Sequence, residues 1–185
     1  MERIPYNHTK KQRLYEVTMN YYIGQALGLM GTLCCLILPF MKKKWQMLAL
    51  TAIVNVFCAL NLVLIGQVGS VILIYVVAVV QTIVALWHLK KDSAVTKAEN
   101  ILFLALYVIC GALDLRTLVD VIPIVGAVFH MLATFQRDVQ KTRVLLLFNS
   151  ITFMAYYALV GSTSVFSTLI TMTSTILAMI RYRKK

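Results

Sequence analysis

Long apolar runs without a charged side chain constrain this chain more than any other feature of its sequence. Seven such blocks follow one another, at residues 19–40, 48–65, 71–87, 101–113, 121–135, 144–160 and 165–180. A soluble core cannot bury that much apolar surface in 185 residues of which 60% are hydrophobic and 14% are charged. The bilayer must therefore act as the solvent, and each block is a candidate membrane helix.

The lengths of the blocks decide which of them can span the bilayer unaided. A spanning helix needs about 20 residues, and about 17 suffice where the bilayer thins or flanking side chains snorkel. The first, second, third, sixth and seventh blocks qualify, whereas 101–113 and 121–135 are short. These two gain length only by extending toward each other through Asp114, Arg116 and Asp120, whose opposite charges can pair at the membrane surface. With that extension the sequence predicts an all-α integral membrane protein with seven transmembrane helices.

The net charge of +11 comes from basic residues in short clusters just outside the apolar blocks. Because no polar domain displays them, they favour positive-inside topology over binding to nucleic acid. With seven spans, thirteen of the 18 Lys and Arg residues fall on one side of the membrane and five on the other. This asymmetry predicts an outside N-terminus and a cytoplasmic C-terminus.

The order of span, basic loop, span, uncharged Gly turn and span occurs twice, in residues 23–88 and in 118–183. An offset of 95 aligns the two without a gap and places Gly31 on Gly126. Three spans are an odd number, so one intervening helix restores the same orientation to the second unit. The sequence therefore predicts parallel repeats in a 3+1+3 bundle. Its parts are an N-terminal tail (1–18), a first three-helix unit (19–89), a linker with the inverting helix (90–117) and a second three-helix unit (118–183).

Short motifs in the spans resemble those of a known superfamily. The segment Leu27-Gly28-Leu29-Met30-Gly31-Thr32-Leu33, followed by Ile37-Leu38-Pro39 and a basic loop, is similar to the first helix of the SWEET and PQ-loop superfamily. Further motifs are Gln25-Ala26-Leu27-Gly28, Leu64-Ile65-Gly66, Val121-Ile122-Pro123-Ile124-Val125-Gly126, Gly161-Ser162 and Met179-Ile180-Arg181-Tyr182. With these motifs, residues 19–183 more narrowly resemble the YgjV-type bacterial inner-membrane proteins. The resemblance implies a SWEET-like fold with a transporter ancestry, and it names no substrate.

The residues that line the sugar site of SWEET proteins are missing at the matching positions. Those proteins carry a Trp in the second helix and an Asn in the third helix of each unit. The matching positions here hold Cys58 and Phe153 in place of Trp, and Ile74 and Leu169 in place of Asn. The resemblance therefore gives no support to sugar transport at the level of residues.

Ionisable and metal-binding side chains are poorly placed for catalysis. The 7 carboxylates lie in tails, loops or span ends, so no pair stands in a sheltered cavity for acid–base chemistry, and no enzyme is predicted. The same distribution argues against a proton relay built on a buried Asp or Glu. The 4 cysteines show neither CxxC spacing nor a His at ligand spacing, so the sequence predicts no metal, no cofactor and no disulfide.

A few polar side chains lie well inside the spans, and His130 is the ionisable one among them. Such a group needs a hydrogen-bond partner or a water-filled cavity, because leaving it unsatisfied in hydrocarbon costs roughly 2–7 kcal/mol. Both interpretations stay open, since polar residues also join membrane helices to one another. If the chain is a transporter, the predicted pathway between the units is lined by His130, Asn55, Asn149, Gln81, Tyr156, Thr171 and Ser174.

The sequence thus predicts a facilitative transporter of a small polar metabolite in the bacterial inner membrane, working by rocking of one unit against the other. The competing interpretation is a non-transporting interaction or accessory protein. A polar, hydrated pocket distinguishes the first, whereas the second is compatible with packing throughout. The expected partners are the lipid bilayer and the small metabolite, without nucleic acid, and homo-oligomerisation stays open.

Overall fold

The computed structural model describes residues 8–64, 70–113, 115, 117–161 and 164–182, and these form helices without any strand. The helices are α1 (His8–Ile37), α2 (Lys44–Leu64), α3 (Ser70–Lys90), α4 (Lys97–Ala112), α5 (Val121–Phe135), α6 (Val139–Val160) and α7 (Ser164–Arg181). Two 3₁₀ turns accompany them, η1 (Leu38–Phe40) and η2 (Leu118–Asp120). The described part of the chain is therefore all-helical, as the sequence predicts.

Within the described residues, 5 helices are long and apolar enough to cross a membrane. These segments are Thr18–Phe40, Lys44–Leu64, Ile72–Lys90, Leu118–Phe135 and Val139–Leu159. The fifth apolar block gains length through Asp120, as predicted, because with η2 it begins at Leu118. The seventh block was predicted to be long enough to span, and instead it forms the shorter apolar helix Val165–Arg181.

Helix α4 stays short, because it ends at Ala112 and does not extend toward α5. With 16 residues it falls below the length of about 20 that a spanning helix needs. Asp120 accepts a hydrogen bond from the backbone N–H of Thr117 at 2.7 Å and so helps to start η2. Asp114 and Arg116, which were expected to pair with it at the membrane surface, lie outside the described residues.

Local sequence explains several helix ends. Pro39 lacks a backbone donor, and there α1 gives way to η1. Asp138 caps α6 by accepting from the backbone N–H groups of Gln140 and Lys141 at 2.7 and 3.0 Å. The same bonds, that of Lys141 first, lower the pKa of the Asp138 carboxyl. Gly161 ends α6 with a φ of 70°, a left-handed conformation that glycine adopts without strain.

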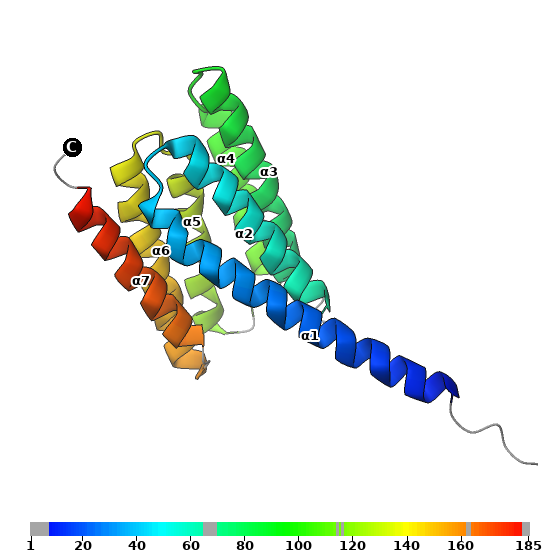
Figure 1. The fold of residues 1–185 in the computed structure, drawn as a ribbon. Helices are drawn as coiled ribbons and strands as arrows, with labels where there is room; N and C mark the ends of the chain where they lie inside the picture. The colour runs from blue at the N-terminus through cyan, green and yellow to red at the C-terminus, as the bar shows by residue number, and fades with distance from the viewer. Residues whose placement is uncertain (1–7, 65–69, 114, 116, 162–163, 183–185) are drawn as a thin grey trace, which may run out of the picture.

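Successive helices alternate in direction, so three connections and the end of α7 gather at one end of the bundle (Figure 1). Hydrogen bonds tie these segments together. Gln140 Nε2 donates to the carbonyl of Tyr182 at 2.7 Å, and Arg137 Nη1 donates to Asp92 Oδ1 at 3.0 Å. We call this end the basic end, because its connections and helix termini carry Lys42, Lys43, Lys90, Lys91, Lys97, Arg137, Lys141 and Arg181.

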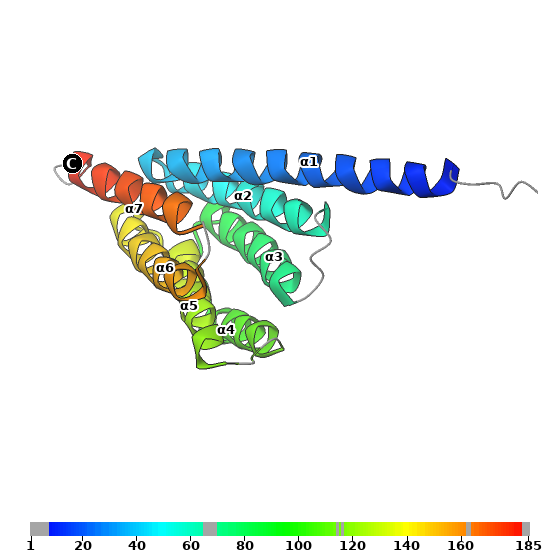
Figure 2. The same ribbon diagram turned by 90° about the horizontal axis from the view of Figure 1, so that it is seen from below.

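Helix α1 is longer than predicted, since it begins at His8 and includes much of the expected tail (1–18). Its first turns project beyond the other helices (Figure 1). Figure 2 shows α1 along one side of the bundle and α4 on the opposite side, next to α5. The 30 residues of α1 correspond to a length of about 45 Å at 1.5 Å per residue, which exceeds the hydrocarbon thickness of about 30 Å.

The exterior is apolar and much of the interior is polar. Leu29, Ile83 and Ile101 are each at least 57% exposed, whereas Gln81 and Thr82 are fully buried. A soluble protein has the opposite distribution. The exposed apolar surface is explained by contact with lipid tails, and the buried polar groups gather where helices pack against helices.

Contacts between the two predicted units are consistent with an internal repeat. Helix α1 packs against α7, and α3 packs against α5, while α4 lies against both α3 and α5. The offset of 95 makes α1 equivalent to α5 and α3 equivalent to α7. The contact between α1 and α7 is then equivalent to the contact between α5 and α3. A Cβ on Gly31 would meet Cys58 Sγ at 3.7 Å, and a Cβ on Gly126 would meet Phe153 Cε2 at 2.7 Å. Equivalent glycines thus face equivalent positions, while the 3+1+3 arrangement itself stays a prediction.

Candidate functional site

Lys44, the first residue of α2, is the buried cation at the centre of the site. Its side chain is only 8% exposed, although Lys42 and Lys43 just before it face outward. The ammonium donates to the carbonyl of Ala133 at 2.8 Å and to Thr142 Oγ1 at 2.9 Å. Since an ammonium has three N–H donors, one lies outside these two bonds. The ion pairs of the described residues do not include Lys44.

Arg143, near the start of α6, is a second buried cation and is 2% exposed. Its Nε and Nη2 donate to the carbonyls of Pro39 and Met41 at 2.8 and 2.9 Å, and its Nη1 donates to Gln140 Oε1 at 2.9 Å. The guanidinium carbon also lies 4.7 Å from the centre of the Tyr182 ring. Arg143 therefore joins the end of α1 to the start of α6 and the end of α7.

Lys44 and Arg143 act as reciprocal clamps between the two units. Lys44 extends from the first unit and binds a carbonyl in the last turn of α5. Arg143 extends from the second unit and binds carbonyls at and just beyond the end of η1. The last carbonyls of a helix have no partner within the helix and carry the negative end of its dipole, so cations are favoured there. Together the clamps close the basic end of the bundle.

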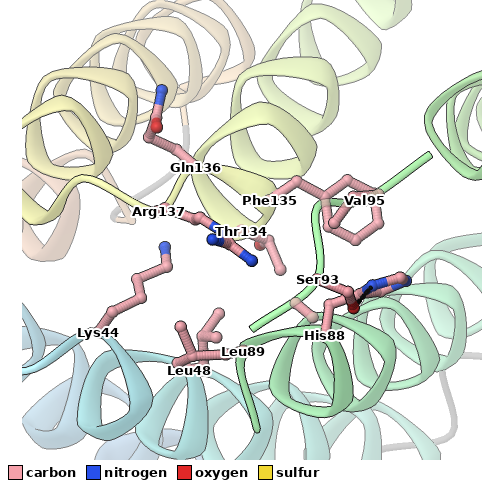
Figure 3. A pocket seen from close by; sticks show the side chains of 11 residues that line it. Lys44, Leu48, His88, Leu89, Ser93, Val95, Thr134, Phe135, Gln136 and Arg137 are labelled. Atoms are coloured by element: carbon pink, nitrogen blue, oxygen red, sulfur yellow. Dashed lines mark hydrogen bonds between the residues drawn. The ribbon is translucent and has the colours of Figure 1, made fainter. Parts of the chain in front are cut away.

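Two small cavities lie beside Lys44. The first has a volume of about 20 Å³ and is lined by residues that include Lys44, His88, Ser93, Thr134 and Arg137. Figure 3 shows Lys44 reaching toward it from one side, with Arg137 and Thr134 on the opposite side.

The second cavity has a volume of about 10 Å³ and is lined by residues that include Thr51, His130, Thr142 and Leu146. Because Lys44, Leu48 and Thr134 line both cavities, the two are adjacent. Each has room for about one water molecule.

Unpartnered polar atoms continue from the second cavity into the bundle. His130 Nε2, Asn55 Nδ2 and Asn149 Oδ1 are buried and have no hydrogen-bond partner among the described residues. Asn55 lies one helical turn beyond Thr51, and Asn149 lies one turn beyond Leu146, so each faces the same side as a residue that lines the cavity. We call Lys44, Thr51, Asn55, His130 and Asn149 the polar column.

Three of the seven predicted pathway residues, His130, Asn55 and Asn149, thus belong to the polar column. Gln81 lies elsewhere and is satisfied: its Nε2 donates to the carbonyl of Met131 at 3.0 Å, and its Oε1 accepts from the Tyr107 hydroxyl at 2.8 Å. These bonds join α3 to α5 and to α4, which fits the packing interpretation of a polar membrane residue.

The structure does not bring the other three predicted residues to the cavities either. The hydroxyls of Thr171 and Ser174 donate to carbonyls of α7 itself, those of Ser167 and Thr171, at 3.0 and 2.8 Å. Tyr156 lies beside Tyr157, with 5.6 Å between the ring centroids. As pathway residues these three and Gln81 stay predictions.

Sequence reasoning missed Lys44, because it grouped this residue with the loop cations Lys42 and Lys43. A usable signal was present. Lys44, Leu48, Thr51 and Asn55 follow one another at intervals of three or four residues, which places them on one face of a helix. Had α2 been extended to its true start, Lys44 would have joined Asn55 among the candidates.

His88, Ser93 and Glu99 organise the α3–α4 connection beside the first cavity. His88 Nδ1 lies 2.8 Å from Ser93 Oγ, and its Nε2 lies 2.9 Å from Glu99 Oε1. Glu99 Oε2 also accepts from the backbone N–H of Thr96 at 2.7 Å, which completes a capping box at the start of α4. The bond from His88, followed by those from Thr96, lowers the pKa of Glu99 from 4.5 to about 2.

This order of hydroxyl, imidazole and carboxylate is also that of a catalytic triad. In the serine protease triad, however, the serine bonds to Nε2 and the carboxylate bonds to Nδ1, and here the two ring nitrogens are exchanged. The backbone N–H of Ser93 already donates to the carbonyl of His88 at 3.0 Å, so it is not available to an oxyanion. We therefore assign these residues to holding the wall of the cavity.

An all-helical bundle with apolar sides, a buried polar column and 5 helices that can cross a membrane defines a polytopic membrane protein. The chain belongs to the Imp-YgjV family, described as a bacterial inner membrane protein, which matches residues 22–185. This match confirms the YgjV-type resemblance and the location in the bacterial inner membrane, and it does not extend to the SWEET and PQ-loop superfamily. No curated protein and no solved structure matches the chain.

Proposed function

We propose that this inner-membrane protein moves a small polar solute across the membrane along the polar column between its two three-helix units. The carrying observation is that His130, whose Nε2 is unpartnered, lines a cavity together with Lys44, and that Asn55 and Asn149, also with unpartnered atoms, lie one helical turn beyond lining residues of that cavity. An unsatisfied polar group in a membrane interior costs several kcal/mol, so a purely packed bundle gains nothing from three of them. Polar groups that replace the hydration of a passing solute account for their presence.

On this proposal the structure is a closed state. The cavities of about 20 and 10 Å³ admit water and exclude a metabolite. Passage requires the two units to rock apart at the basic end, which breaks the bonds of Lys44 to Ala133 and of Arg143 to Pro39. The parallel 3+1+3 arrangement, supported by the equivalence of the α1–α7 and α3–α5 contacts, supplies the two bodies that rock.

We infer further that the basic end faces the cytoplasm and that the N-terminus lies outside. The support is the division of the 18 basic residues that seven spans predict, thirteen to five, together with the gathering of three connections at one end of the bundle. Solute taken from or released to the cytoplasm then passes Lys44.

A non-transporting interaction or accessory protein is the second candidate, and the size of the cavities favours it. Both cavities beside the polar column hold about one water each, and a bundle that never opens needs no more. On that view the unpartnered atoms of the column bind a few fixed waters.

Cysteine labelling separates the two candidates. In a chain whose 4 native cysteines are replaced, Asn149→Cys and Asn55→Cys should react with a small water-soluble maleimide. Their matched controls are the adjacent lipid-facing positions Phe148→Cys and Val56→Cys, at 49% and 40% exposed, which should not react because a thiolate does not form in lipid.

Uptake into vesicles that contain the purified protein completes the test. A screen of small polar metabolites should find at least one that enters faster than into empty vesicles, and His130→Ala should change its rate. Unreactive cysteines at both column positions, together with uptake no faster than in empty vesicles, would overturn the transport proposal in favour of the accessory protein.

A further inference from the structure

The charges around the first cavity are unbalanced. Lys44 and Arg137 line it, and no carboxylate does so among the described residues. Of the nearby carboxylates, Glu99 is bonded to His88 at 2.9 Å, and Asp92 pairs with the cavity cation Arg137 at 3.0 Å. The side chain of Asp92 is 94% exposed, and exposed ion pairs contribute about 0–1 kcal/mol, so Asp92 holds Arg137 only weakly. Arg137 is therefore free to turn toward another anion.

Lys44 is the less well satisfied of the two buried cations. Arg143 combines two carbonyls, an amide oxygen and an aromatic ring, whereas Lys44 has one carbonyl and one hydroxyl. Removing an ammonium from water carries a penalty of several kcal/mol, which neutral acceptors offset only in part. These two bonds use two of the three N–H groups of the ammonium and leave the third outside them. The Lys44 side chain lines the cavity (Figure 3).

The neutral polar groups of the cavity are bonded to neighbours. The Thr134 hydroxyl donates to the carbonyl of His130 at 2.9 Å, Ser93 Oγ is bonded to His88 at 2.8 Å, and Gln136 Oε1 accepts from the backbone N–H of Asp138 at 3.3 Å. A ligand entering here meets the cationic donors of Lys44 and Arg137 beside these groups and apolar walls formed by Leu48 and Leu89. A cation is repelled by this arrangement, and a neutral polar molecule gains less from it than an anion does.

We propose that the cavity at the mouth of the polar column binds an oxyanion, the carboxylate or phosphate group of its ligand, between Lys44 and Arg137. The inference rests on the proposed function, because it assigns the class of solute that the column admits. Binding requires the clamps to loosen, since the closed cavity of about 20 Å³ holds only water. An anion that prefers the loosened state draws the population toward it.

Two sources supply such a group: a small soluble metabolite, and the headgroup of an anionic lipid lying between the helices. Both use the same two cations. They differ in the need for an acyl chain, and the experiment therefore includes one probe of each kind.

The test measures thermal unfolding of the purified full-length protein in a non-ionic detergent. Sodium phosphate and sodium acetate are compared with sodium chloride at equal ionic strength, and phosphatidylglycerol is compared with phosphatidylcholine in mixed micelles. A ligand that binds only the folded protein raises the unfolding midpoint as its concentration exceeds its dissociation constant. We expect at least one anionic probe to raise the midpoint above that of its matched control.

Substitutions locate the effect. Lys44→Gln should weaken the apparent affinity at least tenfold, and Arg137→Gln should weaken it several-fold. Lys43→Gln removes the same charge from an exposed neighbour and should leave the affinity unchanged. If Lys44→Gln does not fold, Arg137→Gln carries the test, because its side chain is 48% exposed and its removal leaves the packing intact.

A shift with phosphate or acetate identifies a soluble anion, and a shift with phosphatidylglycerol alone identifies a headgroup; both support the site. No shift with any probe, or equal losses in the Lys43 variant and in the site variants, overturns it. The transport proposal can be rejected independently of the anion site. Anion binding with unreactive column cysteines and no uptake in vesicles retains the site and rejects transport, whereas uptake of neutral solutes without anion binding does the reverse.

Discussion

Gly31 and Gly126 hold equivalent places in the two units and have unequal room. A Cβ on Gly126 would lie 2.7 Å from Phe153 Cε2, closer than carbon atoms approach, whereas on Gly31 the nearest atoms lie at 3.7 Å. Gly126→Ala should therefore cost about 1–3 kcal/mol by overpacking. Gly31→Ala should be neutral, or stabilise α1 by up to about 1 kcal/mol. Unfolding of both variants in mixed micelles measures the difference, and equal effects would contradict the geometry.

Arg143 should contribute more to stability than any exposed cation of the basic end. Arg143→Met leaves the carbonyls of Pro39 and Met41 buried without a donor, at a cost of about 2–4 kcal/mol. Arg143→Lys should recover little of this, because a point charge cannot reach both carbonyls as the planar guanidinium does. The matched control is Lys141→Gln, an exposed neighbour, with an expected change within about 0.5 kcal/mol. The measurement is unfolding in mixed micelles, and a stable Met variant would show that the clamp contributes little.

Individual residues were predictable where the cost of burying them is independent of their neighbours. His130, Asn55 and Asn149 were found because a polar group deep in an apolar block needs an explanation in any bundle. Gln81 looked the same in sequence, and its satisfaction by Tyr107 depends on the place of α4, which no local pattern reveals. The burial of Lys44 is not evident from a cluster of three lysines, and it becomes predictable only when α2 is extended to its first residue, which places Lys44 on the same face as Thr51 and Asn55.

At the scale of elements, the α3–α4 connection should be sensitive to acid. The folded-state pKa of Glu99, about 2, lies below its ordinary value of 4.5, so the ionised carboxylate stabilises the fold above pH 4.5. That contribution is lost as the pH falls from 4.5 toward 2. Glu99→Gln lacks it, and its unfolding midpoint should fall less than that of the wild type between pH 5 and pH 2.5. Lys97→Gln serves as the control in the same helix, and a parallel fall in all three proteins would exclude this role.

The ends of the helices were predictable only where charged residues mark them. Charge-free blocks located the helices of the described residues. The fifth gains its length through Asp120, as expected, because Thr117 and Asp120 form a capping box that starts η2 before the apolar residues. The seventh was overestimated, because residues 165–180 were accepted as a span and the apolar helix Val165–Arg181 is hardly longer than that block. Hydrogen bonds at helix ends decide such lengths, and hydropathy does not record them.

For the whole molecule, the first expectation concerns orientation. A reporter that works only outside the cytoplasm should be active at the N-terminus, and one that fluoresces only in the cytoplasm should be active at the C-terminus. Changing Lys90, Lys91 and Lys97 at the α3–α4 connection to Gln should weaken the preference, because the asymmetry of basic residues is reduced. If both termini report from the same side, then α4 or α7, the two helices shorter than the five spans, does not cross.

The bonds of Lys44 and Arg143 between the two units also have a consequence for the synthesis of the chain, because they form only after the second unit has been made. Lys44 binds a partner 89 residues later in the chain, and Arg143 binds Pro39 across 104 residues. At about 5–20 residues per second, the ribosome leaves the first unit for several seconds without the partners of Lys44 and of the carbonyls of Pro39 and Met41. We therefore expect membrane proteases to degrade the newly inserted half until its counterpart arrives. A nascent chain that ends at Ser93 should be degraded in cells, and co-expression of residues 94–185 as a second polypeptide should rescue it, as pulse-chase labelling would reveal.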